Sequence, residues 1–526
     1  MSLTTATNQD TVDSKAQQPV SSWRLLLHPR VITLLFLGFS AGIPILLIFS
    51  SLSLWLAEAG TKKSAVTFFS WAALGYSFKF VWAPLVDKLP IPLLTRILGR
   101  RRSWMLLSQL AVIASICWMA LVDPSTGGAS LTLMAFAAVS LGFSSATQDI
   151  VIDAYRIEAA DSDMQALLSS TYVAGYRIGM LVAGAGALYL AARLGSTAES
   201  YNYLAWRWTY MAMAGVMLIG VATTLLIGEP EHRQPDKYHY EVNDYVRFFC
   251  LFLFLVIVFV LIFRFTSFLR GNLSDDLTAM LGNRALSATS IELVRLALAT
   301  FCAWLVARTM VSKAFVSERL VRESYYEPVI DFFKRYGSAA ILLLAIIGVY
   351  RMSDIVLGVV ANLFYQDMGF SKEQIAAVAK TFGLLAIIAG GFLGGLMSIR
   401  FGVIKILWLG AALSAATNLL FVLLANSGAH VPLLYLVIFA DNIAAGLATA
   451  AFIAFLSSLT NISFTAVQYA IFSSLMTLFP KILGGYSGTL VESLGYSQFF
   501  ILTALLTLPV LVLIPIAARF LQSDNE

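Results

Sequence analysis

Two aspartates at a helical spacing are the residues of this 526-residue chain with the clearest chemistry. Asp149 and Asp153 stand four positions apart in a long apolar run, and Gln148 precedes them. In a helix, side chains four positions apart share one face. Two carboxylates on one buried face repel each other, so one of them is suited to carry a proton. The alternative is structural, with Asp153 and Arg156 anchoring the helix to a neighbouring basic loop.

The runs that carry these residues are too long and too apolar for a soluble protein. Hydrophobic residues make up 59% of the chain and charged residues only 12%, whereas roughly a quarter of the residues in soluble domains are charged. The runs reach the roughly 20 residues that a helix needs to cross a bilayer. They do not alternate in polarity as the strands of an outer-membrane barrel would. The sequence therefore predicts an all-α polytopic membrane protein.

The spacing of the apolar runs predicts two six-helix halves and an inserted pair, about 14 spans in all. The halves occupy 31–228 and 338–520, and the connecting segment 229–337 carries extra spans at 244–266 and 289–311. An amphipathic cytoplasmic helix is expected near 312–337. The distribution of Lys and Arg among the loops places both termini in the cytoplasm. The predicted spans of the halves are 31–56, 65–86, 103–122, 129–153, 165–192, 207–228, 338–366, 374–398, 403–425, 431–458, 464–490 and 497–520. Residues 1–30 and 521–526 are expected to form a disordered N-terminal segment and a short tail.

The balance of embedded charges predicts an anionic solute. An ionised side chain at bilayer depth costs about 2.5–3.5 kcal/mol, so it is retained when it is paired, hydrated or used. Here the cations in the spans outnumber the acids. These charges and their polar or aromatic neighbours are the expected substrate contacts: Lys79, Gln148, Tyr176, Arg177, Arg351, Asp354, Lys380, Asp441, Asn442 and Lys481. Snorkelling or helix pairing is the alternative for each cation, and packing is the alternative for the tyrosine. Arg351 and Asp354, three apart, could also pair as a structural salt bridge or as a switchable gate.

A basic loop after the second span is expected to act as a gate. Arg100, Arg101 and Arg102 follow Asp87 at the end of that span, and Arg156 lies at the cytoplasmic end of the fourth span. The loop is predicted to lock the inward-closed state against the fourth span. The topology of the chain would place it there in any case. Small or helix-breaking residues in spans 1 and 5 indicate either broken transporter helices or close packing of the glycines. They are Gly38, Gly42 and Pro44 in span 1 and Gly175, Gly179, Gly184 and Gly186 in span 5.

Catalytic, metal and nucleic-acid sites find no support in the sequence. The four histidines lie in loops or near span ends, the three cysteines lie in apolar runs, and no glycine-rich phosphate loop with a lysine occurs. We therefore expect no enzyme activity and no cofactor or metal, and transport would draw on an ion gradient. The net charge of +5 is small and its basic residues lie in short loops, which does not suggest nucleic-acid binding. The lipid bilayer is the expected environment, and the chain is expected to act as a monomer.

Several segments resemble a known family in the right order. The segments SSATQDIVIDAYRIE (144–158), YSFKFVWAPLVDK (76–88) and GRRRSW (99–104) are similar to those of the AmpG muropeptide permease family within the major facilitator superfamily. The likeness extends to LGFSAGIPILL (37–47), GYRIGMLVAGAGAL (175–188), YRMSD (350–354), VAKTFGLLA (378–386) and TAVQYAIFSSL (465–475). The resemblance covers nearly the whole of both six-span halves.

The resemblance implies proton-driven import of N-acetylglucosamine–anhydro-N-acetylmuramyl peptides across a bacterial inner membrane. This import serves peptidoglycan recycling and signals β-lactamase induction. Positions matching the family motifs are Lys79, Gln148, Asp149, Asp153, Arg177, Asp354 and Lys380. Two alternatives stay open at this stage. One is a transporter of another anionic conjugate such as acetyl-CoA, and the other is a receptor or assembly factor on the same fold, against which the embedded charges count.

Overall fold

The computed structural model is helical throughout the part of the chain that it describes. That part comprises residues 27–61, 74–160, 164–197, 200–230, 240–268, 273, 277–280, 284–484 and 486–523. Thirteen of its helices are long and apolar enough to cross a membrane, which confirms the predicted fold class. The expected terminal segments lie mostly outside the described residues, although Pro29 and Arg30 already belong to the first helix and the last helix reaches Ser523.

The first long helix of the N-terminal half continues through a π-helical turn. A π-helical turn at Leu47–Ser51 joins α2 to α3, and a second one at Val182–Gly186 joins α10 to α11. The helices of this half are α2 (Pro29–Leu46), α3 (Leu52–Glu58), α5 (Leu74–Phe78), α6 (Ala83–Lys88), α7 (Leu94–Leu98), α8 (Arg100–Ala120), α9 (Gly128–Glu158), α10 (Gln165–Leu181), α11 (Ala187–Arg193), α12 (Tyr203–Val216) and α13 (Leu218–Leu226).

The second predicted span, 65–86, is interrupted where it carries its charge. Residues 62–73 lie outside the described part, and the remainder divides into α5, a 3₁₀ turn at Lys79–Val81 and α6. Pro84 occupies the first turn of α6, where a missing backbone N–H does no harm. The interruption holds Lys79 in a buried position at the middle of the half.

The C-terminal half is also interrupted at its first span. The predicted span 338–366 consists of α19 and α20, with Tyr350 capping the end of one and Arg351 the start of the other. The helices of this half are α19 (Ala339–Val349), α20 (Met352–Asp367), α21 (Lys372–Ile375), α22 (Gly383–Phe401), α23 (Val403–Ser427), α24 (Val431–Ser458), α25 (Thr465–Gly484), α26 (Ser487–Leu494), α27 (Tyr496–Leu505) and α28 (Leu508–Ser523).

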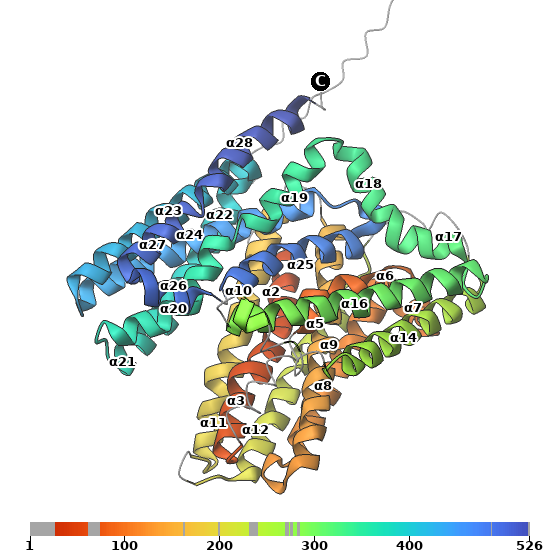
Figure 1. Cartoon of the computed structure of the whole chain (residues 1–526), viewed down its shortest axis with the longest axis horizontal. Coiled ribbons are helices and arrows are strands. Elements are labelled where there is room, and N and C mark those ends of the chain that lie inside the picture. The colour runs from red at the N-terminus through yellow and green to blue at the C-terminus, as the bar shows by residue number, and fades with distance from the viewer. Residues whose placement is uncertain are drawn as a thin grey trace, which may run out of the picture.

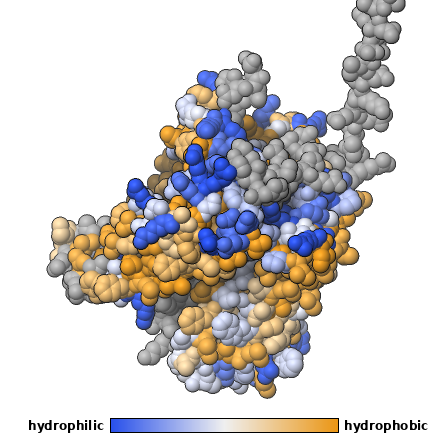
Figure 2. Space-filling view, turned by 90° about the vertical axis from the view of Figure 1, so that its right-hand side faces the viewer, coloured by the Kyte–Doolittle hydropathy of each residue, from blue (hydrophilic) through white to orange (hydrophobic). Residues whose placement is uncertain are grey.

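The connecting segment forms a helical pair and a bridge between the halves. The pair is α14 (Val242–Phe265) and α16 (Arg284–Ser312), and only 17% and 11% of their most apolar stretches are buried. Arg295 of α16 donates a 2.6 Å hydrogen bond to the Phe263 carbonyl of α14. The bridge consists of α17 (Glu318–Val321) and α18 (Glu327–Tyr336). Figure 2 shows a broad hydrophobic zone on the side of the molecule, with hydrophilic side chains gathered above it.

Glycines bring α2 and α10 into backbone contact. A Cβ atom added to Gly38 or Gly42 would lie 2.1 or 2.0 Å from the carbonyl oxygens of Tyr172 and Tyr176. In the reverse direction, one added to Gly175 would lie 2.0 Å from the Leu35 carbonyl oxygen. Close packing of small residues therefore accounts for these glycines, and α2 fixes the position of the polar residues on α10.

The two halves meet at one end and diverge from it (Figure 1). Helix α10 contacts α22 and α24, and α9 contacts α25. Residue Gly395 of α22 packs tightly on Ala166 and Ser170 of α10. Away from this contact, α3, α11 and α12 extend in one direction while α20 and α21 extend in another (Figure 1). We call the region of contact, around Arg101, Glu158 and Thr465, the joined end.

Candidate functional site

The predicted aspartate pair of α9 lies inside the N-terminal half and its two members have different surroundings. Asp153 has two cationic neighbours, because its carboxylate oxygens lie 3.5 Å from Lys79 Nζ and 3.5 Å from Arg156 Nη2. Both carboxylates are about 7% exposed. Asp153 is thus the charge-compensated member of the pair.

Asp149 is the less satisfied member. Its Oδ1 atom is buried and has no hydrogen-bond partner among the described residues. Tyr172 and Tyr176 of α10 and Tyr76 of α5 lie within electrostatic reach of it. Gln148, beside it, donates a 3.0 Å hydrogen bond to Ser40 of α2, while its own Oε1 atom has no partner in the described part. A buried carboxylate oxygen without a donor carries a desolvation cost that no hydrogen bond offsets.

The C-terminal half holds a second pair of carboxylates supported by hydroxyl groups. Asp354 of α20 accepts a 2.6 Å hydrogen bond from Ser414, and Asp441 of α24 accepts one of 3.3 Å from Thr417. Each carboxylate lies within the electrostatic field of the other. The amide of Asn442 is turned toward its own helix and donates to the Ile438 carbonyl at 2.9 Å.

The possible pair between Arg351 and Asp354 does not form in the described structure. Asp354 is bound by the Ser414 hydroxyl, and the buried Nε atom of Arg351 has no hydrogen-bond partner. The reason is the break between α19 and α20: Arg351 caps α20 in a non-helical conformation, so the two residues do not have the register of a continuous helix.

Cations from both halves approach each other between them. Arg177 of α10 and Arg351, at the start of α20, lie within electrostatic reach of each other. Lys481 of α25 donates a 3.1 Å hydrogen bond to Ser77 of α5, so it also connects the halves. The side chain of Lys380, another predicted contact, lies outside the described part of the structure. Two arginines from opposite halves near one another form a geometry that an anion would stabilise.

At the joined end, where the sequence predicts a gate, Arg101 is fully buried. Its guanidinium contacts Asp87 at 2.7 Å and Glu158 at 2.6 Å, and its Nε atom also reaches both oxygens of Glu158. Thr465, at the start of α25 in the other half, donates to Glu158 and accepts a 3.2 Å hydrogen bond from Arg101. We call Asp87, Arg101, Glu158 and Thr465 the inter-half cluster.

The neighbours of Arg101 in the basic triplet act within their own half. Arg100 donates to the Asp87 carbonyl at 2.6 Å, and Arg102 donates to the Thr224 and Leu225 carbonyls at 3.0 and 2.8 Å. Arg101 reaches Glu158 at the end of the fourth span, at 2.6 Å. Consecutive residues of a helix point in different directions, which accounts for the different partners of the three arginines.

Arg156 forms a second connection between the halves. Its Nη1 atom donates to Ser457 of α24 at 2.8 Å and to Ser169 of α10 at 3.0 Å. The guanidinium also lies 5.1 Å from the centre of the Tyr469 ring of α25. Since Arg156 also neighbours Asp153, the carboxylates of α9 are linked to the contact between the halves.

Sequence analysis missed four partners of this arrangement, Glu158, Ser457, Thr465 and Tyr469. Glu158 could have been found, because it ends the same polar stretch as Arg156 and faces the basic loop by topology. The other three are uncharged residues some 300 positions away from their partners. Nothing in their local sequence distinguishes them from residues that pack.

These features define a membrane transporter of two helical halves with a polar site between them. A model of the Major Facilitator Superfamily matches residues 89–320 and 342–525. The chain is 31% identical over 485 residues to the "Putative transporter AmpG 4" of Rickettsia felis, covering 92% of this chain and 95% of that one. It is 27% identical over 500 residues to the "Anhydromuropeptide permease" of Escherichia coli K12, covering 95% and 82%.

Solved structures agree on the fold. The proton:xylose symporter XylE has a TM-score of 0.55 at 13% identity, with 93% of this chain and 94% of that chain covered. The fucose:proton symporter FucP of E. coli has a TM-score of 0.56 at 11% identity, with 93% and 98% covered. The chain belongs to the major facilitator superfamily and, within it, to the AmpG group of transporters.

Proposed function

We propose that the chain is a proton-coupled importer of anhydromuropeptides, carrying sugar-bearing, anionic peptides from the periplasm to the cytoplasm for peptidoglycan recycling. The single observation that carries the proton coupling is the buried, unpartnered Oδ1 atom of Asp149 beside the compensated carboxylate of Asp153. The name of the E. coli relative supports the choice of substrate. The proposed location is the bacterial inner membrane, with both termini and the joined end on the cytoplasmic side.

The proposed mechanism is alternating access, in which the two halves rock around a site at mid-membrane. With the joined end closed, substrate enters between the diverging parts of the halves. Its carboxylates meet Arg177 and Arg351, one from each half, and offset their mutual repulsion. A proton taken up by Asp149 removes a charge from the α9 face before the site closes.

The link to the cytoplasmic closure runs along α9. Arg156 is shared between Asp153 in the site and Ser457 in the other half. A change in charge at the aspartate pair alters the competition for Lys79 and Arg156, and with it the strength of the contact between the halves. Opening would then require release of both Arg156 and the inter-half cluster.

Uptake into proteoliposomes tests this function. The purified chain would be supplied with labelled anhydromuropeptide, with and without an inward proton gradient, and with acetyl-CoA as a competing solute. We expect gradient-dependent uptake that acetyl-CoA does not reduce. Equal uptake with and without the gradient would overturn proton coupling. Transport of acetyl-CoA in place of the muropeptide would overturn the proposed substrate. Glu492→Gln, which neutralises an exposed acid of α26, is the matched control for aspartate variants.

A further inference from the structure

The two halves each carry a surface pocket in the same place. In the N-terminal half, a groove of about 740 Å³ is lined by the start of α2 and by the end of α13 with the chain after it. In the C-terminal half, a pocket of about 460 Å³ is lined by the end of α18, by the start of α19 and by Phe520 near the end of α28. Helices α2 and α19 are the first of their halves, and α13 and α28 are the last. Both pockets therefore lie where the first and the last helix of a half pack together.

The groove of the N-terminal half has apolar walls and a basic mouth. Ile32 and Phe36 of α2 and Ile219 of α13 line it and are 40–43% exposed. Arg30 lies at the mouth, in the first turn of α2, and is exposed. Glu229 also lines the groove, but its carboxylate oxygens accept the backbone N–H groups of Arg101 and Arg102 at 2.8 and 3.1 Å.

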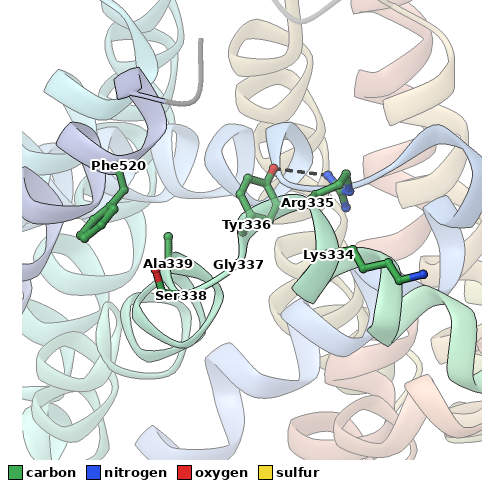
Figure 3. Close-up of a pocket in the computed structure, with 7 residues that line it drawn as sticks. All are labelled: Lys334, Arg335, Tyr336, Gly337, Ser338, Ala339 and Phe520. Carbon is green, nitrogen blue, oxygen red and sulfur yellow. Dashed lines mark hydrogen bonds between the residues drawn. The ribbon is translucent and has the colours of Figure 1, made fainter. Parts of the chain in front are cut away.

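The pocket of the C-terminal half is smaller and more basic. Figure 3 shows Phe520 facing Ser338 and Ala339 on one side, and Lys334 at the opposite rim with its amine directed outward. Arg335 contributes its backbone region, while its guanidinium is committed to Asp331 at 2.9 Å and to the Leu459 carbonyl at 3.1 Å. Lys334 is exposed, so its charge is available to a ligand at the rim.

We propose that both pockets bind anionic phospholipid at the joined end of the transporter. The groove would hold one acyl chain along α2 and α13 with its phosphate at Arg30, and the second pocket would hold a headgroup beside Lys334. The occupant follows from the combination of chemistry and place. Apolar walls on the outer surface of membrane-spanning helices meet acyl chains, and basic side chains at the ends of those helices meet lipid phosphates.

Exposed apolar residues next to the second pocket support a membrane-surface position. Val329, Ile330 and Phe333 of α18 are 40–41% exposed, and Lys334 and Arg335 follow them in the same helix. A short helix with an apolar face and basic residues lies favourably in the interface of an anionic membrane. This inference rests on the membrane location of the chain and not on its substrate.

A lipid bound in the groove would also stabilise the closed state of the joined end. Gly228 accepts a 3.2 Å hydrogen bond from the Tyr155 hydroxyl of α9, and Glu229 caps the start of α8 immediately before Arg101 enters the inter-half cluster. The wall of the groove is thus the segment that positions Arg101. Occupation of the groove would hold this segment in place and favour the closed state of the joined end.

Native mass spectrometry of the full-length chain released from nanodiscs tests the proposal. The probes are phosphatidylglycerol and phosphatidylcholine with identical acyl chains. We expect preferential retention of phosphatidylglycerol, about fivefold weaker in each of Arg30→Gln and Lys334→Gln. The matched control is Arg193→Gln, which removes an exposed basic residue at the far end of α11.

Each remaining outcome would overturn part of the proposal. Equal retention of the two lipids, or an unchanged preference in the double variant Arg30→Gln/Lys334→Gln, would eliminate the headgroup sites. Displacement of phosphatidylglycerol by soluble glycerol phosphate would show that the groove binds a free phosphate and not a lipid chain. If Arg193→Gln lost as much phosphatidylglycerol retention as the other variants, the preference would depend on the net charge of the protein and not on the two pockets.

Discussion

Arg156 and Ser457 are joined by a 2.8 Å hydrogen bond across 301 positions of the chain. The arginine belongs to α9, which carries the aspartate pair, and the serine belongs to α24 of the other half. Because Arg156 also lies 3.5 Å from Asp153, one buried guanidinium serves both the polar site and the contact between the halves. A change of charge in the site therefore has a direct physical route to the closure.

Neutralising the two aspartates should have different effects. Asp149→Asn removes a carboxyl group whose Oδ1 atom has no partner, so we expect the thermal midpoint to stay unchanged or rise while gradient-driven uptake falls more than tenfold. Asp153→Asn removes the carboxylate that forms ion pairs with the buried Lys79 and Arg156, so we expect a lower midpoint as well. Thermal unfolding and proteoliposome uptake measure both quantities.

The double variant Lys79→Gln/Asp153→Asn provides the control for this difference. It removes both members of the ion pair, so stability should recover relative to Asp153→Asn alone. Equal loss of stability in Asp149→Asn and Asp153→Asn would contradict the assignment of Asp149 as the less satisfied carboxylate.

Thr465→Val should weaken the closure of the joined end without disturbing either half. The substitution preserves the shape of the side chain but removes the hydroxyl group that donates to Glu158. Hydrogen bonds to charged groups contribute about 1.5–3 kcal/mol, so the equilibrium between closed and open states should shift by more than tenfold. Distances between spin labels at Arg96 and Ile462, both exposed at this end, measure the population.

Ser493→Ala is the matched control, since it removes an exposed hydroxyl of α26 that donates only to its own helix. An unchanged distance distribution in Thr465→Val would mean that the inter-half cluster does not hold the closed state.

The fold was predictable from the sequence because its signal is repeated along the whole chain. Apolar runs of bilayer length, two sets of six with a pair between them, leave few alternative architectures. The charged members of the site were predictable for a related reason: charges inside such runs are costly and therefore conspicuous. Asp149, Asp153, Lys79 and Arg351 were found in this way.

Contacts between the halves could not be predicted to the same extent. Ser457 and Thr465 lie in segments whose composition differs little from that of ordinary packing helices, and their role depends on which helix faces them. The break between α19 and α20 at Arg351 was also not predictable, so the absence of the Arg351–Asp354 pair in the described structure could not be foreseen. An i, i+3 spacing implies a pair only if the helix is continuous, and the sequence around Tyr350 contains no proline or glycine pair that would announce the interruption.

The backbone contact between α2 and α10 should make Gly42→Ala severely destabilising. Its new Cβ atom would lie 2.0 Å from the Tyr176 carbonyl oxygen, and overpacking of this kind costs about 1–3 kcal/mol. Gly215→Ala in α12 is the matched control, because nothing lies within 4 Å of the added Cβ. Removing a helix glycine there should raise stability by up to about 1 kcal/mol. Thermal unfolding in detergent would distinguish them, and similar midpoints for the two variants would contradict the contact.

The nearness of Arg177 and Arg351 should affect the kinetics of transport. Arg351→Gln removes one of the two cations that are proposed to meet the substrate anion, so the KM of a carboxylate-bearing muropeptide should rise about tenfold, which corresponds to roughly 1.4 kcal/mol. For an analogue with its peptide carboxylates converted to amides, the wild type and the variant should have the same KM. Arg351→Lys should restore part of the affinity, since an ammonium supplies the charge without the planar donor pair of a guanidinium. Arg400→Gln, which neutralises an exposed arginine at the end of α22, is the control. An equal rise in KM for the amide analogue would show that Arg351 acts through packing and not through the charge of the substrate.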